Sequence, residues 1–142
     1  NNHLYRLITH GLELEPHELA TITFLQYSLG QDIELIPPSH TPGARMADFL
    51  MNGIAWEAKS PQGKELRTVE HAFKNASKQS ENIIIDLRRT RMSTTGSVKL
   101  LEKHFNLSRR VKRMLIITRE QKLLDYRKKY AKIKLLEAPE VV

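Results

Sequence analysis

The sequence contains no cysteine among its 142 residues, and this absence excludes several kinds of site at once. A disulfide framework, a zinc site built on thiolates and a cysteine nucleophile are all ruled out. No apolar run approaches the roughly 20 residues that a membrane-spanning helix requires, and no signal peptide is visible. The 40% of hydrophobic residues and the length nevertheless suffice for a buried core. We expect one domain over residues 1–126 and a basic C-terminal tail over 127–142, for which a frayed helix and partial disorder both stay open.

Acidic residues are scarce in the second part of the chain. Residues 1–87 hold 7 Lys and Arg against 11 Asp and Glu, whereas residues 88–142 hold 16 against 5. The whole chain carries a formal charge of +7. A basic region beside an acidic one suits an enzyme that acts on a polyanion, because cations hold phosphates while carboxylates hold metal. The charge pattern therefore favours a nucleic-acid partner over a plain solvated surface.

The dipeptide Asn52-Gly53 between two apolar runs predicts a tight β-hairpin, because both turn positions need positive φ angles. Counting outward from this turn places Asp48 opposite Glu57, with Lys59 on the same face of the hairpin. Two like charges in directly opposed positions destabilise a sheet. A divalent cation held between the two carboxylates would account for the pair. This interpretation requires that no bulge interrupts the register before Asp48.

The remaining patterns predict an α/β fold. Residues 1–13 are expected to be irregular or a short helix, and Ser97 is expected to cap the last helix. Helices are predicted over 16–29, 68–80 and 98–105, and strands over 33–36, 48–51, 54–59, 83–87, 114–118 and 122–126. The strand over 83–87 is a nearly continuous apolar run, which predicts a central parallel strand, and its Asp86 is expected to pair with a nearby arginine. The element order predicts a mixed central sheet flanked by helices.

The first helix carries a third acid toward the predicted site. Glu18 extends the apolar stripe of Ile22, Leu25 and Leu29, so it should face the sheet near the acidic pair. Trp56 lies on the opposite, core-facing side of the hairpin by the same counting, so we do not expect it to stack on a base.

These residues resemble the PD-(D/E)xK nuclease superfamily. Asp48 matches the motif aspartate and Glu57-Ala58-Lys59 matches the (D/E)xK element, although Ala47 stands where the motif names proline. Glu18 looks like the acid that many members carry on an N-terminal helix. Gln79 matches a glutamine that several branches carry on the helix after the motif.

The resemblance implies a restriction-endonuclease-like αβββαβ core and a metal-dependent endonuclease. It implies Mg²⁺ or Mn²⁺, with Zn²⁺ as an alternative, held by Asp48, Glu57 and Glu18. The implied catalytic residues are Glu18, Asp48, Glu57, Lys59 and Gln79.

Two stretches, 56–61 and 71–89, are similar to the C-terminal tRNase-type toxin domains of CdiA proteins, which act in contact-dependent growth inhibition. This likeness implies a tRNA-cleaving toxin neutralised by a cognate immunity protein, with DNA as the alternative substrate. It implies delivery to the cytoplasm of a target bacterium as part of a larger secreted protein, and the start without Met also suggests a piece of a longer chain. The residues expected to bind nucleic acid are the basic ones near the site and after it: Arg67, His71, Lys74, Lys78, Arg88, Arg89, Arg109, Arg110, Lys112 and Arg113.

Two alternatives stay open. A metal-independent RNase would use histidine with lysine as general acid and base, and His40 or His71 with Lys59 are candidates. A non-catalytic nucleic-acid-binding module would need the acids only for its structure. The first alternative leaves the opposition of Asp48 and Glu57 unexplained, so we rank it second.

Overall fold

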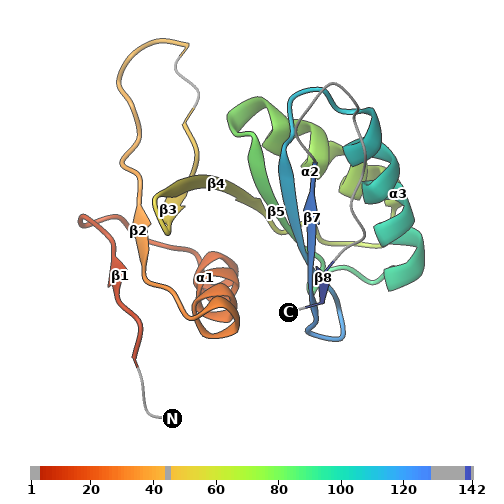
Figure 1. Cartoon of the computed structure of the whole chain (residues 1–142), viewed down its shortest axis with the longest axis horizontal. Coiled ribbons are helices and arrows are strands. Elements are labelled where there is room, and N and C mark those ends of the chain that lie inside the picture. The colour runs from red at the N-terminus through yellow and green to blue at the C-terminus, as the bar shows by residue number, and fades with distance from the viewer. Residues whose placement is uncertain (1–3, 44–45, 129–139, 142) are drawn as a thin grey trace.

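The fold is one mixed β-sheet with helices on both faces (Figure 1). The computed structural model describes residues 4–43, 46–128 and 140–141. Within these residues the sheet has eight strands, which lie side by side in chain order from β1 to β8. The elements are β1 (Leu7–Ile8), α1 (Pro16–Leu29), β2 (Ile33–Leu35), β3 (Phe49–Met51), β4 (Ile54–Lys59), α2 (Leu66–Gln79), β5 (Asn82–Asp86), α3 (Thr94–Leu107), β6 (Arg113–Ile117), β7 (Leu123–Arg127) and β8 (Glu140–Val141).

The sheet combines hairpins at its two sides with a parallel centre. β4, β5 and β6 run parallel to one another, and the crossovers between them are α2 and α3. β3 pairs antiparallel with β2 and β4, and β7 pairs antiparallel with β6 and β8. The predicted order α-β-β-β-α-β is present as α1-β2-β3-β4-α2-β5. The α/β class with a mixed central sheet is therefore confirmed.

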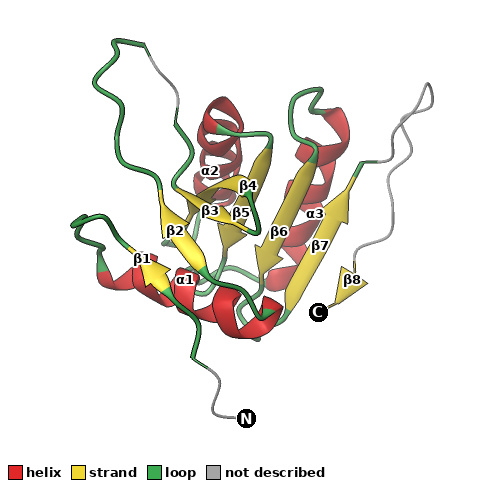
Figure 2. Ribbon diagram, turned by 60° about the vertical axis from the view of Figure 1, so that its left-hand side comes forward, coloured by secondary structure: helices red, strands yellow, loops and turns green. Residues whose placement is uncertain are grey.

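The central strand β5 separates two hydrophobic clusters. Ile83 and Ile85 face the cluster that contains residues of α2 and α3, while Ile84 faces the cluster that contains residues of α1. All three side chains are fully buried. This alternation follows from the period of two along a strand, and it puts α1 on one face and the other two helices on the opposite face (Figure 2). A strand covered on both faces explains why residues 83–85 are apolar without alternation.

The predicted hairpin turn is present at Asn52-Gly53. Both residues have positive φ angles, 53° and 74°, as a two-residue hairpin turn of this kind requires. The next three residue pairs follow the predicted register, ending with Phe49 opposite Trp56. Phe49 and Trp56 are each 1% exposed, so the predicted core face of the hairpin is confirmed.

The start of α3 differs from the prediction. The N-cap is Ser93, whose hydroxyl accepts a hydrogen bond from the backbone N–H of Gly96 at 3.1 Å. Ser97 lies inside the helix, is 1% exposed, and its hydroxyl has no hydrogen-bond partner. The expectation that Ser97 caps the helix is wrong. Gly96 is a weak helix former, so the sequence does not indicate the first turn of α3, which the Ser93 cap stabilises.

The two ends of the chain also differ from the prediction in their local structure. Leu7–Ile8 forms the short strand β1, parallel to β2, where an irregular segment or a helix was expected. Arg127 is the last residue of β7, and Glu140–Val141 pairs with that strand as β8. The rest of the predicted tail, apart from Lys128, lies outside the described residues. No helix among the described residues is long and apolar enough to cross a membrane.

The two serines of α3 provide a matched test of this helix start. Ser93→Ala should lower the free energy of unfolding by about 1 kcal/mol, because it removes the N-cap hydrogen bond. Ser97→Ala should leave the stability unchanged or raise it, because it removes a buried hydroxyl without a partner. Urea denaturation of both variants beside the unsubstituted chain measures the difference. A larger loss for Ser97→Ala than for Ser93→Ala would contradict this assignment.

Candidate active site

The hairpin register breaks at Asp48, at the predicted acidic pair itself. The backbone N–H of Asp48 donates to the carbonyl of Trp56 at 2.9 Å, which leaves Glu57 without a ladder partner on β3. The backbone N–H of Ala58 instead donates to Oδ2 of the Asp48 side chain at 2.9 Å. The predicted ladder pairing of Asp48 with Glu57 is therefore wrong. The two residues are still neighbours, because the Asp48 side chain is tied to the residue that follows Glu57.

Glu57 is a buried carboxylate on the sheet face that α2 covers. It lies beside Ile83 of β5 and is 4% exposed. Its Oε2 forms an ion pair with Nζ of Lys59 at 3.2 Å, while its Oε1 is buried without a hydrogen-bond partner. Burial raises the pKa of Glu57 to about 7, and the negative charge of Asp48 adds to the rise. Glu57 is thus a carboxylate that exchanges a proton near neutral pH.

Asp48 is more open to solvent than Glu57. Partial loss of hydration raises the pKa of Asp48, and the charge of Glu18 contributes to the rise. The N–H of Ala58 and the charge of Lys59 act in the opposite direction. One exposed and one buried carboxylate therefore share a single lysine.

Asp48 and Lys59 line a cavity of about 590 Å³ between α1 and the hairpin. Glu18 lines the same cavity, as predicted, and so do His17 and Ser60. Glu57 does not line the cavity, but it forms an ion pair with Lys59, which does.

Glu18 has a structural role as well as a place in the cavity. Its Oε1 accepts a hydrogen bond from the backbone N–H of Glu15 at 2.8 Å, at the start of α1. The described residues contain no group of three His, Asp or Glu side chains placed to hold a metal ion together. Asp48 and Glu57 thus stand as a pair, and the role of Glu18 as a third ligand stays a prediction. Gln79, the last residue of α2, makes no hydrogen bond to either carboxylate.

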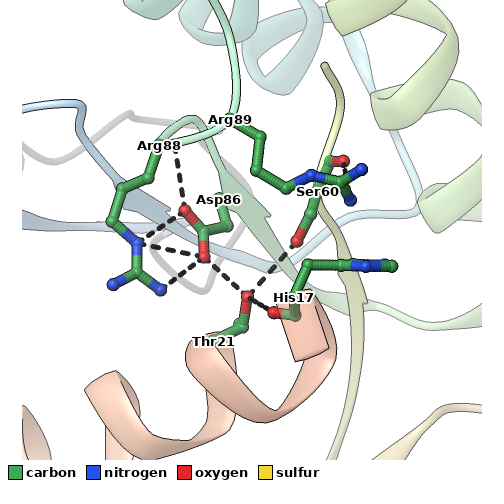
Figure 3. Close-up of polar contacts among 6 residues, drawn as sticks. All are labelled: His17, Thr21, Ser60, Asp86, Arg88 and Arg89. Carbon is green, nitrogen blue, oxygen red and sulfur yellow. Dashed lines mark hydrogen bonds and ion pairs between the residues drawn. The ribbon is translucent and has the colours of Figure 1, made fainter. Parts of the chain in front are cut away.

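A second polar cluster, centred on the buried Asp86, supports the same cavity (Figure 3). Asp86 is 3% exposed and lies at the end of β5. It accepts the hydroxyl of Thr21 at 2.6 Å and a pair of hydrogen bonds from Arg88, with Nε 3.0 Å from Oδ1 and Nη2 2.8 Å from Oδ2. The expected partnership of Asp86 with an arginine is therefore confirmed.

This Asp86 cluster fixes helix α1 against the sheet. The Thr21 hydroxyl also lies 3.2 Å from the hydroxyl of Ser60 and 3.1 Å from the carbonyl of His17. The Arg88 guanidinium is 4.9 Å from the ring centre of Phe24 on the same helix. Because Thr21 lies one turn after His17 and Glu18, these contacts also set the position of the residues that α1 contributes to the cavity.

The sequence prediction missed Thr21. It lies four residues before Leu25, on the buried side of α1, and this spacing was the available signal. Its partner Asp86 is 65 residues away, so no local pattern indicates the contact.

The basic residues predicted to bind nucleic acid fall into two groups. In the first group, Arg88 and Arg113 each form an ion pair with a buried aspartate. Arg88 pairs with Asp86 at 2.8 Å and Arg113 with Asp125 at 2.9 Å. Arg89 donates to the carbonyl of Ser60 at 3.3 Å and to Oε1 of Gln62. The others are exposed, on or near α2 or in the loop after α3: Arg67, His71, Lys74, Lys78, Arg109, Arg110 and Lys112. Their binding to nucleic acid stays a prediction.

Comparison with protein families decides the relationship of the chain. Residues 45–123, more than half of its length, match the family model described as the contact-dependent growth inhibition CdiA C-terminal domain. The chain belongs to this family. The matched segment contains Asp48, Glu57, Lys59 and the Asp86 cluster apart from its α1 residues.

A solved structure has the same fold as this CdiA C-terminal domain. It is the CdiA-CT/CdiI toxin and immunity complex from Burkholderia pseudomallei, matched with a TM-score of 0.58 and 17% sequence identity. The match covers 86% of this chain and 98% of that chain. At this identity the likeness bears on the fold alone. No curated protein sequence matches the chain.

The raised pKa of Glu57 has a consequence for stability in the absence of metal. Below its ordinary value of 4.5 the carboxyl group is protonated in both the folded and the unfolded chain. Between pH 4.5 and about 7 the unfolded chain releases this proton while the folded chain keeps it, so stability is lost as the pH rises to the folded value and stays level above it. Relative to Glu57→Gln, the unsubstituted chain should lose on the order of 2 to 3 kcal/mol between pH 4.5 and pH 8.

Urea denaturation in EDTA across this pH range measures that loss. Glu70→Gln is the control, because hydrogen bonding to His104 and the charge of Lys74 lower the pKa of Glu70, so its contribution should be gained as pH rises. Parallel stability curves for the unsubstituted chain and Glu57→Gln would contradict the burial argument.

Thr21 and Thr23 form a matched pair on α1. Thr21→Val should lower the free energy of unfolding by about 1 to 3 kcal/mol, because Asp86 loses a buried hydrogen bond. Thr23→Val makes the same change at an exposed position of the helix and should have an effect below about 0.5 kcal/mol. Equal effects in thermal or urea unfolding would show that the Asp86 cluster does not hold the helix.

Proposed function

We propose that this CdiA C-terminal domain is a metal-dependent endonuclease of the PD-(D/E)xK type, and that tRNA is its substrate. The observation that carries the proposal is the buried Oε1 of Glu57, which has no hydrogen-bond partner beside Asp48 and Lys59. A buried unpaired carboxylate oxygen is costly, so a ligand that satisfies it is expected.

The donor set fits a divalent cation. Carboxylate oxygens are the ligands that Mg²⁺ and Mn²⁺ prefer. The backbone carbonyl of Ala58, between Glu57 and Lys59, is a further candidate oxygen ligand. We propose Asp48 and Glu57 as the ligands, with Glu18 assisting from α1. A bound cation would supply a Lewis acid and a water of lowered pKa. Zn²⁺ is an alternative metal.

Lys59 has its own part in the proposed reaction. Its ammonium group is 3.2 Å from Glu57 Oε2, and its side chain is 37% exposed, at the wall of the cavity. A cation at this position can orient the substrate phosphate and stabilise the negative charge that develops on it in the transition state.

We propose that the chain acts as a toxin in the cytoplasm of a target bacterium and that a cognate immunity protein neutralises it. Membership of the contact-dependent growth inhibition family supports this role. The solved structure with this fold is described as a complex of a toxin with its immunity protein, which supports a partner of the same kind.

Cleavage of labelled tRNA with Mg²⁺ or Mn²⁺ tests the proposed activity. Asp48→Asn, Glu57→Gln and Lys59→Met should each lower the cleavage rate at least about a hundredfold, because each removes a metal ligand or the cation at the phosphate. Glu13→Gln is the matched control, since Glu13 lines the same cavity and should leave the rate within about threefold.

Addition of EDTA separates the metal-dependent reaction from its rival. EDTA should abolish cleavage, and added Mg²⁺ or Mn²⁺ should restore it. Cleavage that persists in EDTA would instead support a histidine-based RNase, for which His17 is the histidine that lines the cavity. Cleavage of DNA but not of tRNA would replace the substrate and keep the site.

A further inference from the structure

A second cavity, of about 670 Å³, lies where the loop after β4 enters α2. Its lining is basic and comes from two loops and the first turns of α2: Gly63, Lys64, Glu65, Arg67, Thr68, His71 and Arg91. We call it the basic pocket. It is separate from the Asp48 cavity, with which it shares no lining residue.

Backbone contacts between two loops build the basic pocket. Gly63 pairs with Thr90 in a parallel bridge, and the N–H of Arg91 donates to the carbonyl of Gly63 at 2.8 Å. Gly63 has a φ angle of +104°, which residues other than glycine rarely adopt. Thr90 is 3% exposed and its hydroxyl donates to the carbonyl of Leu87 at 2.8 Å. Lys64 and Arg91 are thus brought together by fixed backbone rather than by a chance approach of long side chains.

The charges of the basic pocket do not cancel internally. Arg67 pairs with Glu65 at 3.2 Å, but both side chains are exposed, at 77% and 64%, so the pair contributes little. Among the described residues, Lys64 and Arg91 have no ion pair and no side-chain hydrogen bond. Two or more cations that converge without a counter-charge favour a bound anion. His71 adds a side chain that can donate a hydrogen bond to the same ligand.

The basic pocket lies close to the proposed site of cleavage. Gly63 follows Lys59 by four residues, so the connecting chain spans at most about 14 Å. Arg89 lies along this connection, with its side chain beside Ser60 (Figure 3). Its guanidinium donates to the carbonyl of Ser60 and to Oε1 of Gln62. Cations therefore follow one another from Lys59 past Arg89 to the basic pocket. A succession of cations suits a polynucleotide, which repeats its phosphates along the strand.

We propose that the basic pocket binds a backbone phosphate of the nucleic-acid strand whose cleaved bond lies at Asp48 and Glu57. This inference rests on the proposed nuclease function and adds to it a second phosphate site. The ligand is a phosphodiester of a polynucleotide rather than free phosphate or a mononucleotide. Lys64 and Arg91 are the residues that hold it.

Binding of fluorescein-labelled unfractionated tRNA, measured by anisotropy in EDTA at several salt concentrations, tests the proposal. The double variant Lys64→Ala/Arg91→Ala should bind at least about tenfold more weakly at 100 mM salt, and its salt slope should fall by about 1 to 2. The control is Lys99→Ala/Lys103→Ala, which removes the same charge from exposed positions of α3 that line neither cavity. It should change the affinity less than about threefold. Both variants should keep the thermal midpoint of the unsubstituted chain, because the four residues are exposed.

The outcomes separate this proposal from the proposed function. Equal losses of affinity in the two double variants would overturn the basic pocket, and so would an unchanged salt slope in Lys64→Ala/Arg91→Ala. A third outcome concerns the ligand. If the unsubstituted chain binds a mononucleotide, and Lys64→Ala/Arg91→Ala loses that binding but keeps full tRNA affinity, the pocket does not bind a polynucleotide and the proposal is overturned. An unsubstituted chain that binds tRNA but does not cleave it with Mg²⁺ or Mn²⁺ would overturn the nuclease alone, since the binding assay excludes metal. A chain that binds neither tRNA nor single-stranded DNA would overturn both.

Discussion

The burial of the Glu57 carboxylate is the constraint on which the site depends. The free energy of a buried carboxylate rises steeply when its charge is not compensated, and one lysine at 3.2 Å compensates only one of its two oxygens. The protein can reduce this cost by protonating Glu57 or by binding a cation. The first response raises the pKa to about 7, and the second would return it toward its ordinary range. A carboxylate in this state responds both to pH and to the charge of Asp48.

Such a carboxylate is tolerable only on a rigid support. β4 supplies this support because it lies between the β3 hairpin and the parallel strand β5, which is buried on both faces. The Asp86 cluster supplies the other wall of the cavity by tying α1 to the ends of β4 and β5. Asp86 and Glu57 are both buried acids, but their environments differ. Asp86 has a bidentate arginine and a hydroxyl, whereas Glu57 keeps one oxygen without a partner. That contrast is typical of one structural and one reactive carboxylate.

Sequence reasoning located the hairpin because the turn at Asn52-Gly53 and the alternation of apolar residues are local signals. It failed at Asp48, the residue most important for the site. Extending the register from the turn assumes that every backbone N–H of the hairpin pairs with a backbone carbonyl. The Asp48 side chain takes the N–H of Ala58 and so breaks the ladder. Aspartate competes with the backbone in this way in many turns and strand ends. The carboxylates are nevertheless close, so the register was wrong in detail while the neighbourhood it predicted was right.

The contacts between distant segments were beyond the reach of the pattern. Nothing in residues 16–29 indicates that Thr21 meets Asp86, and nothing in residues 60–65 indicates that Gly63 pairs with Thr90. The first contact depends on the packing of α1 against the sheet. The second arises because parallel strands end at the same edge of a sheet, so the loops after β4 and β5 are neighbours whatever their sequences. Net charge alone also does not tell which basic residues are available to bind nucleic acid. Arg88 and Arg113 were expected to do so, but each forms an ion pair with a buried aspartate. Lys64 and Arg91 contribute no less to the net charge and stay available to a ligand, since the one acid of their pocket, Glu65, pairs with Arg67 instead.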